Sequence, residues 1–458
     1  MRRRPLLKGA LMLMAAGAMT RALGTLYRIL IVRWAGAEAL GLFQMVLPLY
    51  RMASTMATLR LPVALTQVTA DALARGRLDQ VHRARRVTAA LIMAMTGLTA
   101  LTVVGAAPFL AGRYLTDPRT GLLILLLPLA FVPSALTGIF RGFAEGRQNM
   151  ASTATGQVVE QLIRVPVVLL CLSWWGGRGV EYAAAALVVG LGAGETAGLI
   201  TAMIMSGWWR LPRPAASGGA RAPWSGWARI LRPPVFLVLD HLQTARALLG
   251  LSLPLWVATM VNTAAQMINV GLIPRRLLAA GVSMAAATEL YGQLTGMVLP
   301  LLYMPMLLVF PVATVLTPAI ADAWALGQHG RARRRFYLAT AGALAVGLAT
   351  TALCWAFPAA LPRLLYGMPE VAPLVRVAGL AAPFAFTANI FASVLYALGK
   401  TALVLSTFIL TTVVRLGLIY VLTADPHLGI VGALWAIVAD YALTALLNGW
   451  ACLRWLRG

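Results

Sequence analysis

The sequence is poor in histidine and cysteine, and these shortages argue against a metal site and a disulfide framework. Its 458 residues include 14 Asp and Glu, four His and three Cys. The histidines fall in separate predicted loops, without the spacing of a metal site. The cysteines lie far apart within apolar runs and form no CxxC motif, which favours packing over disulfides. We therefore expect neither a metal nor another cofactor.

Motifs for catalysis and nucleotide binding are also lacking. Gly399-Lys400-Thr401 resembles the end of a phosphate-binding P-loop, but Val394 stands where that motif requires glycine. No polar stretch is long enough for an ATPase domain, and no Ser/His/Asp arrangement is evident. The sequence predicts a protein that is not an enzyme.

Apolar residues dominate the composition. Hydrophobic residues make up 60% of the chain and charged residues 11%, with a mean hydropathy of +0.80. Soluble proteins carry about a quarter charged residues, whereas runs of about 20 apolar residues are long enough to cross a bilayer. The net charge of +24 is typical of cytoplasmic loops in membrane proteins, so we expect no nucleic acid partner. The expected fold class is an all-α polytopic membrane protein.

The apolar runs predict about twelve transmembrane helices, six in each of two lobes. The expected domains are an N-terminal lobe at 1–207, a cytoplasmic linker at 208–246 and a C-terminal lobe at 247–458. The first apolar run is too long for a signal-peptide core, so we expect it to remain as a span. With a cytoplasmic N-terminus, inner segments hold about 24 Lys and Arg and outer loops about seven. This asymmetry predicts that both termini are cytoplasmic. The predicted spans are 6–32, 42–70, 87–112, 120–140, 150–173, 182–207, 247–273, 288–318, 336–361, 371–397, 402–423 and 429–453.

Short motifs of the first lobe recur in the second, roughly 250 residues later. The segment VLPL occurs at 46–49 and at 298–301, and ADA occurs at 70–72 and at 321–323. Arg164 corresponds to Arg415 in the same register. An even number of spans per repeat gives both halves the same orientation, related by pseudo-twofold symmetry about the membrane normal. We expect a binding cavity where the lobes meet.

Seven arginines interrupt the predicted spans, where facing lipid costs several kcal/mol. Snorkelling to a headgroup is favoured for Arg376, near the outer end of its span, and is open for Arg28. The other five are expected in a wet cavity or a buried pair: Arg21, Arg51, Arg60, Arg164 and Arg415.

Two predicted spans also carry polar stripes at helical spacing. One stripe comprises Gln157, Glu160, Gln161 and Arg164, and the other comprises Asn262, Gln266 and Asn269. Both are candidates for substrate contact. The alternatives are an intrahelical Glu160–Arg164 pair and interhelical hydrogen bonds. Glu195 and Asp440 are lone acids within spans, which could bind protons or Na⁺ or could neutralise nearby arginines.

Several motifs resemble the MOP exporter superfamily, in its polysaccharide-biosynthesis branch typified by stage V sporulation protein B. The opening motif is Thr20-Arg21-Ala22-Leu23-Gly24, followed by Gly41-Leu42-Phe43-Gln44. The most specific stretch runs from Phe140-Arg141-Gly142 through 146–150 to the polar stripe that ends at Arg164. Matches in the second half, such as Tyr291-Gly292 and Pro300, extend the resemblance over nearly the whole chain.

This resemblance implies a flippase for undecaprenyl-pyrophosphate-linked saccharides, including peptidoglycan precursors, in a bacterial cytoplasmic membrane. Related lipid II flippases bind the anionic headgroup with arginines of the first two spans. Arg21 matches that motif well, Arg28 approximately and Arg51 by location, whereas Arg60 and Arg415 are inferred from their depth. Many relatives have fourteen spans, and the pair expected to be missing here forms the lipid-tail groove in lipid II flippases.

Two other functions remain open. A multidrug exporter coupled to H⁺ or Na⁺ would need cavity acids, yet the first two predicted spans carry four arginines and no acid near mid-span. A non-transporting scaffold for envelope synthesis would have no need of arginines within its spans. The expected partners are an anionic lipid-linked saccharide and membrane lipid, with envelope-synthesis enzymes as a further candidate.

Overall fold

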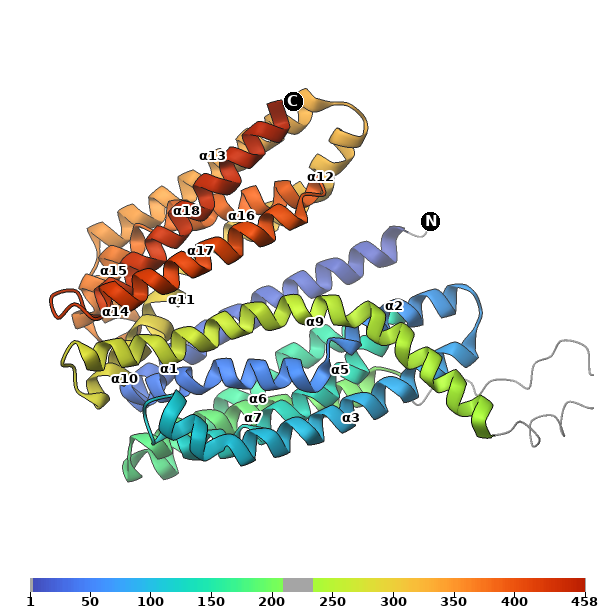
Figure 1. Ribbon diagram of the computed structural model, residues 1–458, viewed down its shortest axis with the longest axis horizontal. Coiled ribbons are helices and arrows are strands. Elements are labelled where there is room, and N and C mark those ends of the chain that lie inside the picture. The colour runs from blue at the N-terminus through green and yellow to red at the C-terminus, as the bar shows by residue number, and fades with distance from the viewer. Residues whose placement is uncertain (1–2, 209–233, 458) are drawn as a thin grey trace, which may run out of the picture. The chain divides into compact units, whose positions relative to one another are not determined.

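The computed structural model describes the backbone of residues 3–208 and 234–457, and side chains at 17, 19–20, 22–208 and 241–456. Every regular element in these ranges is helical (Figure 1), which confirms the expected all-α membrane fold. The first-half elements are α1 (Arg3–Thr58), α2 (Leu61–Ala74), α3 (Leu78–Phe109), η1 (Leu110–Tyr114), α4 (Thr120–Leu126), α5 (Pro128–Gly146), α6 (Met150–Trp175), η2 (Gly176–Arg178) and α7 (Val180–Met205). The second-half elements are α9 (Pro234–Ala279), α10 (Met284–Gly292), η3 (Gln293–Val298), α11 (Leu299–Tyr303), α12 (Met306–Ala325), α13 (His329–Ala356), α14 (Ala360–Tyr366), η4 (Pro369–Val371), α15 (Ala372–Gly379), α16 (Ala382–Ala397), α17 (Thr401–Leu422) and α18 (Ile430–Arg457).

Ten helices in the described ranges are long and apolar enough to cross a membrane, or eleven with one bent pair. One of them, Ala22–Ala74, has 53 residues and would measure about 80 Å if straight, far more than one crossing needs. It contains a break at Gly36, whose φ of 80° and ψ of 170° are not helical. Glycine allows this backbone conformation because it has no Cβ. The break lies between the first two predicted spans.

Several predicted spans are interrupted, including the following three. The span expected at 120–140 is divided into α4 and α5, and α5 continues to Gly146. The span expected at 288–318 comprises α10, η3, α11 and α12, with η3 in π-helical geometry. The span expected at 371–397 bends by 46° between Gly379 and Ala382. Proline at the start of α5, α11 and α16 accounts for the new helix starts, because it lacks the amide hydrogen that a continuous helix needs.

The chain divides into two compact units. The first comprises residues 1–27 and 45–267, and the second comprises residues 28–44 and 268–458. Residues 234–246 of the predicted linker belong to helix α9, and residues 209–233 lie outside the described part of the structure. The lobe boundaries expected from sequence remain a prediction.

Each unit has its own helical core. In the first unit α7 packs against α5 and α6, and α2 packs against α5. In the second unit α18 packs against α16 and α17, and α16 packs against α13 (Figure 1). All three cysteines, Cys171, Cys354 and Cys452, are buried with free thiols, in agreement with a packing role.

Matching hydrogen bonds occur in the two halves. The hydroxyl of Thr66 in α2 donates to the carbonyl oxygen of Gly142 in α5 at 2.9 Å. Roughly 250 residues later, the hydroxyl of Thr317 in α12 donates to the carbonyl oxygen of Ser393 in α16 at 3.4 Å. The sequence repeat is therefore accompanied by repeated contacts between corresponding helices.

A second matched contact holds the end of the last helix in each half. Arg85 near the start of α3 donates to the carbonyl oxygen of Trp208 at 2.6 Å, just beyond α7. Arg333 near the start of α13 donates twice to the carbonyl oxygen of Leu456 in α18, at 3.1 and 2.7 Å. Cations are favourable at helix C-termini because the terminal carbonyl groups carry partial negative charge.

Two glycines of the second unit lie at a close helix crossing. A Cβ atom at Gly41 in α1 would clash with the carbonyl oxygen of Thr288 in α10. A Cβ atom at Gly292 would clash with the carbonyl oxygen of Ala37 and with the backbone of Gly41. Both positions therefore require glycine, and the two contacts are related by the same offset of roughly 250 residues.

Candidate functional site

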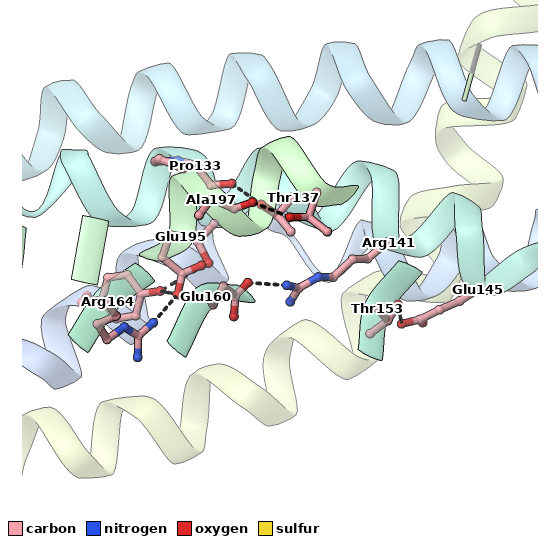
Figure 2. A network of polar contacts seen from close by, with 12 residues as sticks. Pro133, Thr137, Arg141, Glu145, Thr153, Glu160, Arg164, Glu195 and Ala197 are labelled. Carbon is pink, nitrogen blue, oxygen red and sulfur yellow. Dashed lines mark hydrogen bonds and ion pairs between the residues drawn. The ribbon is translucent and has the colours of Figure 1, made fainter. Parts of the chain in front are cut away.

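The first unit contains a buried polar network on α5, α6 and α7 (Figure 2). Arg141 of α5 forms an ion pair with Glu160 of α6. One turn along α6, Arg164 forms an ion pair with Glu195 of α7 at 3.4 Å. The four side chains point toward one another between the three helices, so two cations and two anions form a compact cluster.

Helix α1 also contributes to this network. The hydroxyl of Tyr50 donates to a carboxylate oxygen of Glu195 at 3.0 Å and lies 3.3 Å from the hydroxyl of Ser134. Glu195 therefore accepts hydrogen bonds from both Tyr50 and Arg164. These contacts connect α1 and α6 to α7 through one carboxylate.

Glycine on α7 permits the close approach of these helices. A Cβ atom at Gly198 would collide with the carboxylate of Glu160, and one at Gly194 would collide with the Glu160 carbonyl oxygen. The sequence Gly-Glu-Thr-Ala-Gly at 194–198 therefore places one acid between two residues that have no side chain. The small residues create the space that the ion pairs occupy.

A related network lies in the second unit. Arg415 of α17 forms an ion pair with Asp440 of α18 at 2.9 Å, and the hydroxyls of Tyr303 and Tyr441 are hydrogen-bonded to each other. Arg415 corresponds to Arg164 in the repeat, and Tyr303, like Tyr50, follows a VLPL segment. Each half thus combines an arginine–acid pair between its last two long helices with a nearby tyrosine.

These pairs account for Glu195 and Asp440. Each acid contacts an arginine, which is the arrangement expected if the acids neutralise nearby cations. Unpaired charges are costly away from water, so an opposite charge stabilises each buried arginine. The alternative Glu160–Arg164 intrahelical pair is not formed, because Glu160 pairs with Arg141. A role of either acid in ion coupling stays a prediction.

Arg51 takes part in a different arrangement, which joins α1 to α9. Its guanidinium donates to the side-chain oxygen of Gln266 at 3.0 Å. The amide nitrogen of Gln266 donates in turn to the side-chain oxygen of Asn262 at 2.8 Å. Arg51 is exposed and Gln266 is half-buried. Two residues of the predicted α9 stripe are therefore brought to Arg51, and one of them makes the expected interhelical hydrogen bond.

Arg60 lies at the break between α1 and α2. Leu59 and Arg60 have φ values of 48° and 56°, a left-handed conformation that is uncommon for residues other than glycine. The Arg60 side chain is exposed and forms no hydrogen bond or ion pair within the described part of the chain. A charged side chain thus occupies an irregular point of the backbone inside a predicted span.

The other predicted site residues are less closely connected. Arg28 is half-buried and lies near Tyr366, which is outside the candidate spans. Burial raises the pKa of Tyr366 above its usual value, and the positive charge of Arg28 opposes part of this shift. The side chain of Arg21 lies outside the described residues. Gln157 makes no side-chain hydrogen bond in the described ranges, and the amide oxygens of Gln161 and Asn269 are buried there without partners. The expected cavity between two lobes stays a prediction.

Sequence reasoning missed Arg141, Tyr50, Tyr303 and Tyr441. Arg141 was placed just outside a span expected to end at 140, whereas α5 continues to Gly146. The tyrosines lie within apolar runs and gave no signal of a polar role. Among the described residues no group of His, Cys, Asp or Glu could hold a metal ion.

Several known proteins are similar to this chain in sequence. The sequence profile of a family described as "Polysaccharide biosynthesis protein" matches residues 6–324. Stage V sporulation protein B of Bacillus subtilis (strain 168) is 30% identical over 456 residues, covering 98% of this chain and 83% of that protein. Lipid II flippase MurJ of the same organism is 26% identical over 341 residues, covering 71% of this chain and 59% of that protein.

Solved transporter structures share the fold. An inward-facing multidrug resistance MATE family transporter of the MOP superfamily matches with a TM-score of 0.69 at 13% identity. The match covers 95% of this chain and 94% of that one. An outward-facing transporter of that family matches with a TM-score of 0.56 at 14% identity, covering 100% and 97% of the two chains. At these identities the comparison concerns architecture rather than substrate.

Proposed function

Because this chain belongs to the polysaccharide biosynthesis protein family of the MOP exporter superfamily, we propose that it carries an undecaprenyl-pyrophosphate-linked saccharide across a bacterial cytoplasmic membrane. The chain is a multi-pass membrane protein of a flippase-type transporter family. In this proposal the saccharide headgroup moves from the inner to the outer leaflet by alternating access, while the lipid tail remains among membrane lipids. Peptidoglycan precursors are one candidate cargo.

The observation that carries the proposal is the pair of exposed arginines in the second predicted span. Arg51 and Arg60 are both exposed, and Arg51 is oriented by the neutral amide of Gln266. A guanidinium stays charged at any relevant pH and donates two parallel hydrogen bonds to phosphate oxygens. These properties suit a pyrophosphate headgroup better than a cationic drug.

A comparison of the two halves strengthens this choice. Arg164 and Arg415 occur at corresponding positions and each contacts an acid, so we leave both out of the proposed headgroup site. By contrast, the corresponding predicted span of the second half, 288–318, contains no basic residue. The arginines of the second span are thus a property of one half, which distinguishes them from the repeated structural pairs.

Complementation of a strain depleted of lipid II flippases tests the proposal. Wild-type protein should restore growth. Arg51→Glu and Arg60→Glu should restore it less well, because the loss of a charged hydrogen bond lowers headgroup affinity about tenfold or more. Arg376→Glu is the matched control, since Arg376 is exposed on α15 and lies outside the proposed site. Membrane levels of all variants should be equal.

Normal growth with both charge reversals would contradict the proposed site. Failure of the wild-type protein to restore growth, combined with raised resistance to cationic dyes, would favour the multidrug-export alternative instead.

A further inference from the structure

Arg51 determines which end of the Gln266 side-chain amide faces it. A guanidinium has only donors, so the side chain of Gln266 must present its oxygen to Arg51. Its amide nitrogen then needs an acceptor, and the side-chain oxygen of Asn262 lies 2.8 Å away, one turn earlier on α9. The sequence of donors and acceptors therefore runs from Arg51 through Gln266 to Asn262.

Neighbouring hydroxyls on α9 do not compete for this arrangement. Thr259 donates to the carbonyl oxygen of Leu255 at 2.8 Å, and Thr263 donates to the carbonyl oxygen of Thr259 at 2.9 Å. Both hydroxyls are thus engaged with their own helix. Gln266 contacts Arg51 directly, and Asn262 is bound to Gln266.

Gln266, which binds Arg51, differs in kind from the acids that pair with the repeated arginines. Arg164 and Arg415 have 14% and 17% of their side chains exposed, and each contacts a carboxylate. Arg51 is exposed and contacts an amide. An amide fixes the orientation of a guanidinium without adding a negative charge that would repel an anionic ligand.

Helix α1 also fixes Arg51 from its other side. Tyr50, the preceding residue, is hydrogen-bonded to Glu195, so this turn of α1 is held toward α7. Arg51 projects from the same turn to α9. The side chain is therefore aligned at its base by Tyr50 and at its end by Gln266.

We propose that Gln266 is a positioning residue that holds the Arg51 guanidinium for the phosphate groups of the substrate. This inference rests on the proposed function and assigns the selectivity for an anionic headgroup to the amide. Replacing the amide by a carboxylate, as in Gln266→Glu, places a negative charge beside Arg51 without changing the shape of the side chain. The same site would then repel the phosphate groups.

The test measures binding of undecaprenyl pyrophosphate to the purified full-length chain in detergent, with undecaprenol as the uncharged comparison. Gln266→Glu should weaken binding of the pyrophosphate about tenfold or more, and Gln266→Met should weaken it less, because no charge is added. Gln328→Glu is the matched control, since Gln328 lies between two candidate spans and likewise accepts a hydrogen bond from an arginine, Arg331, at 2.8 Å. Thermal unfolding temperatures should stay within a few degrees of the wild type.

A double-mutant cycle separates positioning from a general structural effect. In the Arg51→Gln background, the uncharged Gln266→Met should have no further effect on pyrophosphate affinity. Equal losses caused by Gln266→Met in both backgrounds, or wild-type binding by Gln266→Glu, would overturn the inference while leaving the proposed function intact. Wild-type binding by Arg51→Gln would overturn both. Binding of undecaprenol as tightly as of the pyrophosphate would do the same.

Discussion

Arg164 and Glu195 form an ion pair at 3.4 Å between α6 and α7, with 14% and 12% of their side chains exposed. The second half contains the corresponding pair of Arg415 and Asp440 at 2.9 Å. Two charges in such surroundings depend on each other, because removing one leaves the other without compensation. This relationship makes these arginines part of the architecture of each half.

Breaking one of these pairs should cost more than removing it entirely. Glu195→Leu should lower the free energy of unfolding by about 3 kcal/mol, because Arg164 loses its compensating charge. The Arg164→Leu/Glu195→Leu double variant should be closer to the wild type, since no charge is left behind. Thermal unfolding of the purified protein in detergent measures both. A double variant less stable than either single variant would contradict this account.

The close crossing of α1 and α10 should not tolerate a methyl group. Gly41→Ala places a Cβ against the carbonyl oxygen of Thr288, and such overpacking should destabilise the protein by about 2 kcal/mol. Gly97→Ala is the control, because Gly97 lies inside α3 with no atom near the added Cβ. There the change should be neutral or stabilising by about 0.5 kcal/mol. Equal effects of the two substitutions on thermal unfolding would refute the packing argument.

Arg85 of α3 and Arg333 of α13, which bind carbonyl oxygens near the ends of α7 and α18, should stabilise each half to a similar degree. Arg85→Ala removes a hydrogen bond to the carbonyl oxygen of Trp208, just beyond α7, and Arg333→Ala removes two to the carbonyl oxygen of Leu456 in α18. Each substitution should cost about 1 kcal/mol. Arg334→Ala is the matched control, because Arg334 is an exposed neighbour in α13 without such a bond in the described structure. The measurement is again thermal unfolding. Indistinguishable unfolding midpoints for all three variants would show that the hydrogen bonds of Arg85 and Arg333 contribute nothing to stability.

Cysteine labelling can test the proposed orientation. The native thiols of Cys171, Cys354 and Cys452 are buried, so the folded wild-type protein should react little with a membrane-impermeant maleimide. Arg178→Cys, in the exposed turn after α6, should be labelled in intact cells. Gln328→Cys, between α12 and α13, should be labelled only after the membrane is opened. The reverse pattern would show that the termini lie on the outer side.

Hydropathy located most helices of this fold because a span must bury about 20 residues in lipid whatever its partners are. It failed at the interruptions, where local backbone geometry decides. Hydropathy predicted that the span containing α5 ends at residue 140, whereas α5 continues to Gly146. The additional residues include Arg141, which joins the polar network. Arg141 therefore counted as a cytoplasmic loop residue.

The partners of the polar residues were harder to predict than their presence. Glu160 and Arg164 have the spacing of an intrahelical pair, yet each finds its partner on another helix. Packing of α7 against α6, made possible by Gly198, decides this outcome, and spacing within one helix carries no information about it. The repeat gave better guidance, since Arg164 and Arg415 correspond in sequence and also in their contacts.

The left-handed backbone at Leu59 and Arg60 has a mechanical consequence. Between α1 and α2 the chain can change direction by adjusting two residues, whereas rotation within either helix would break several backbone hydrogen bonds. The charge of Arg60 is attached directly to this joint. Movement of the Arg60 side chain and a change of chain direction between α1 and α2 therefore involve the same two residues.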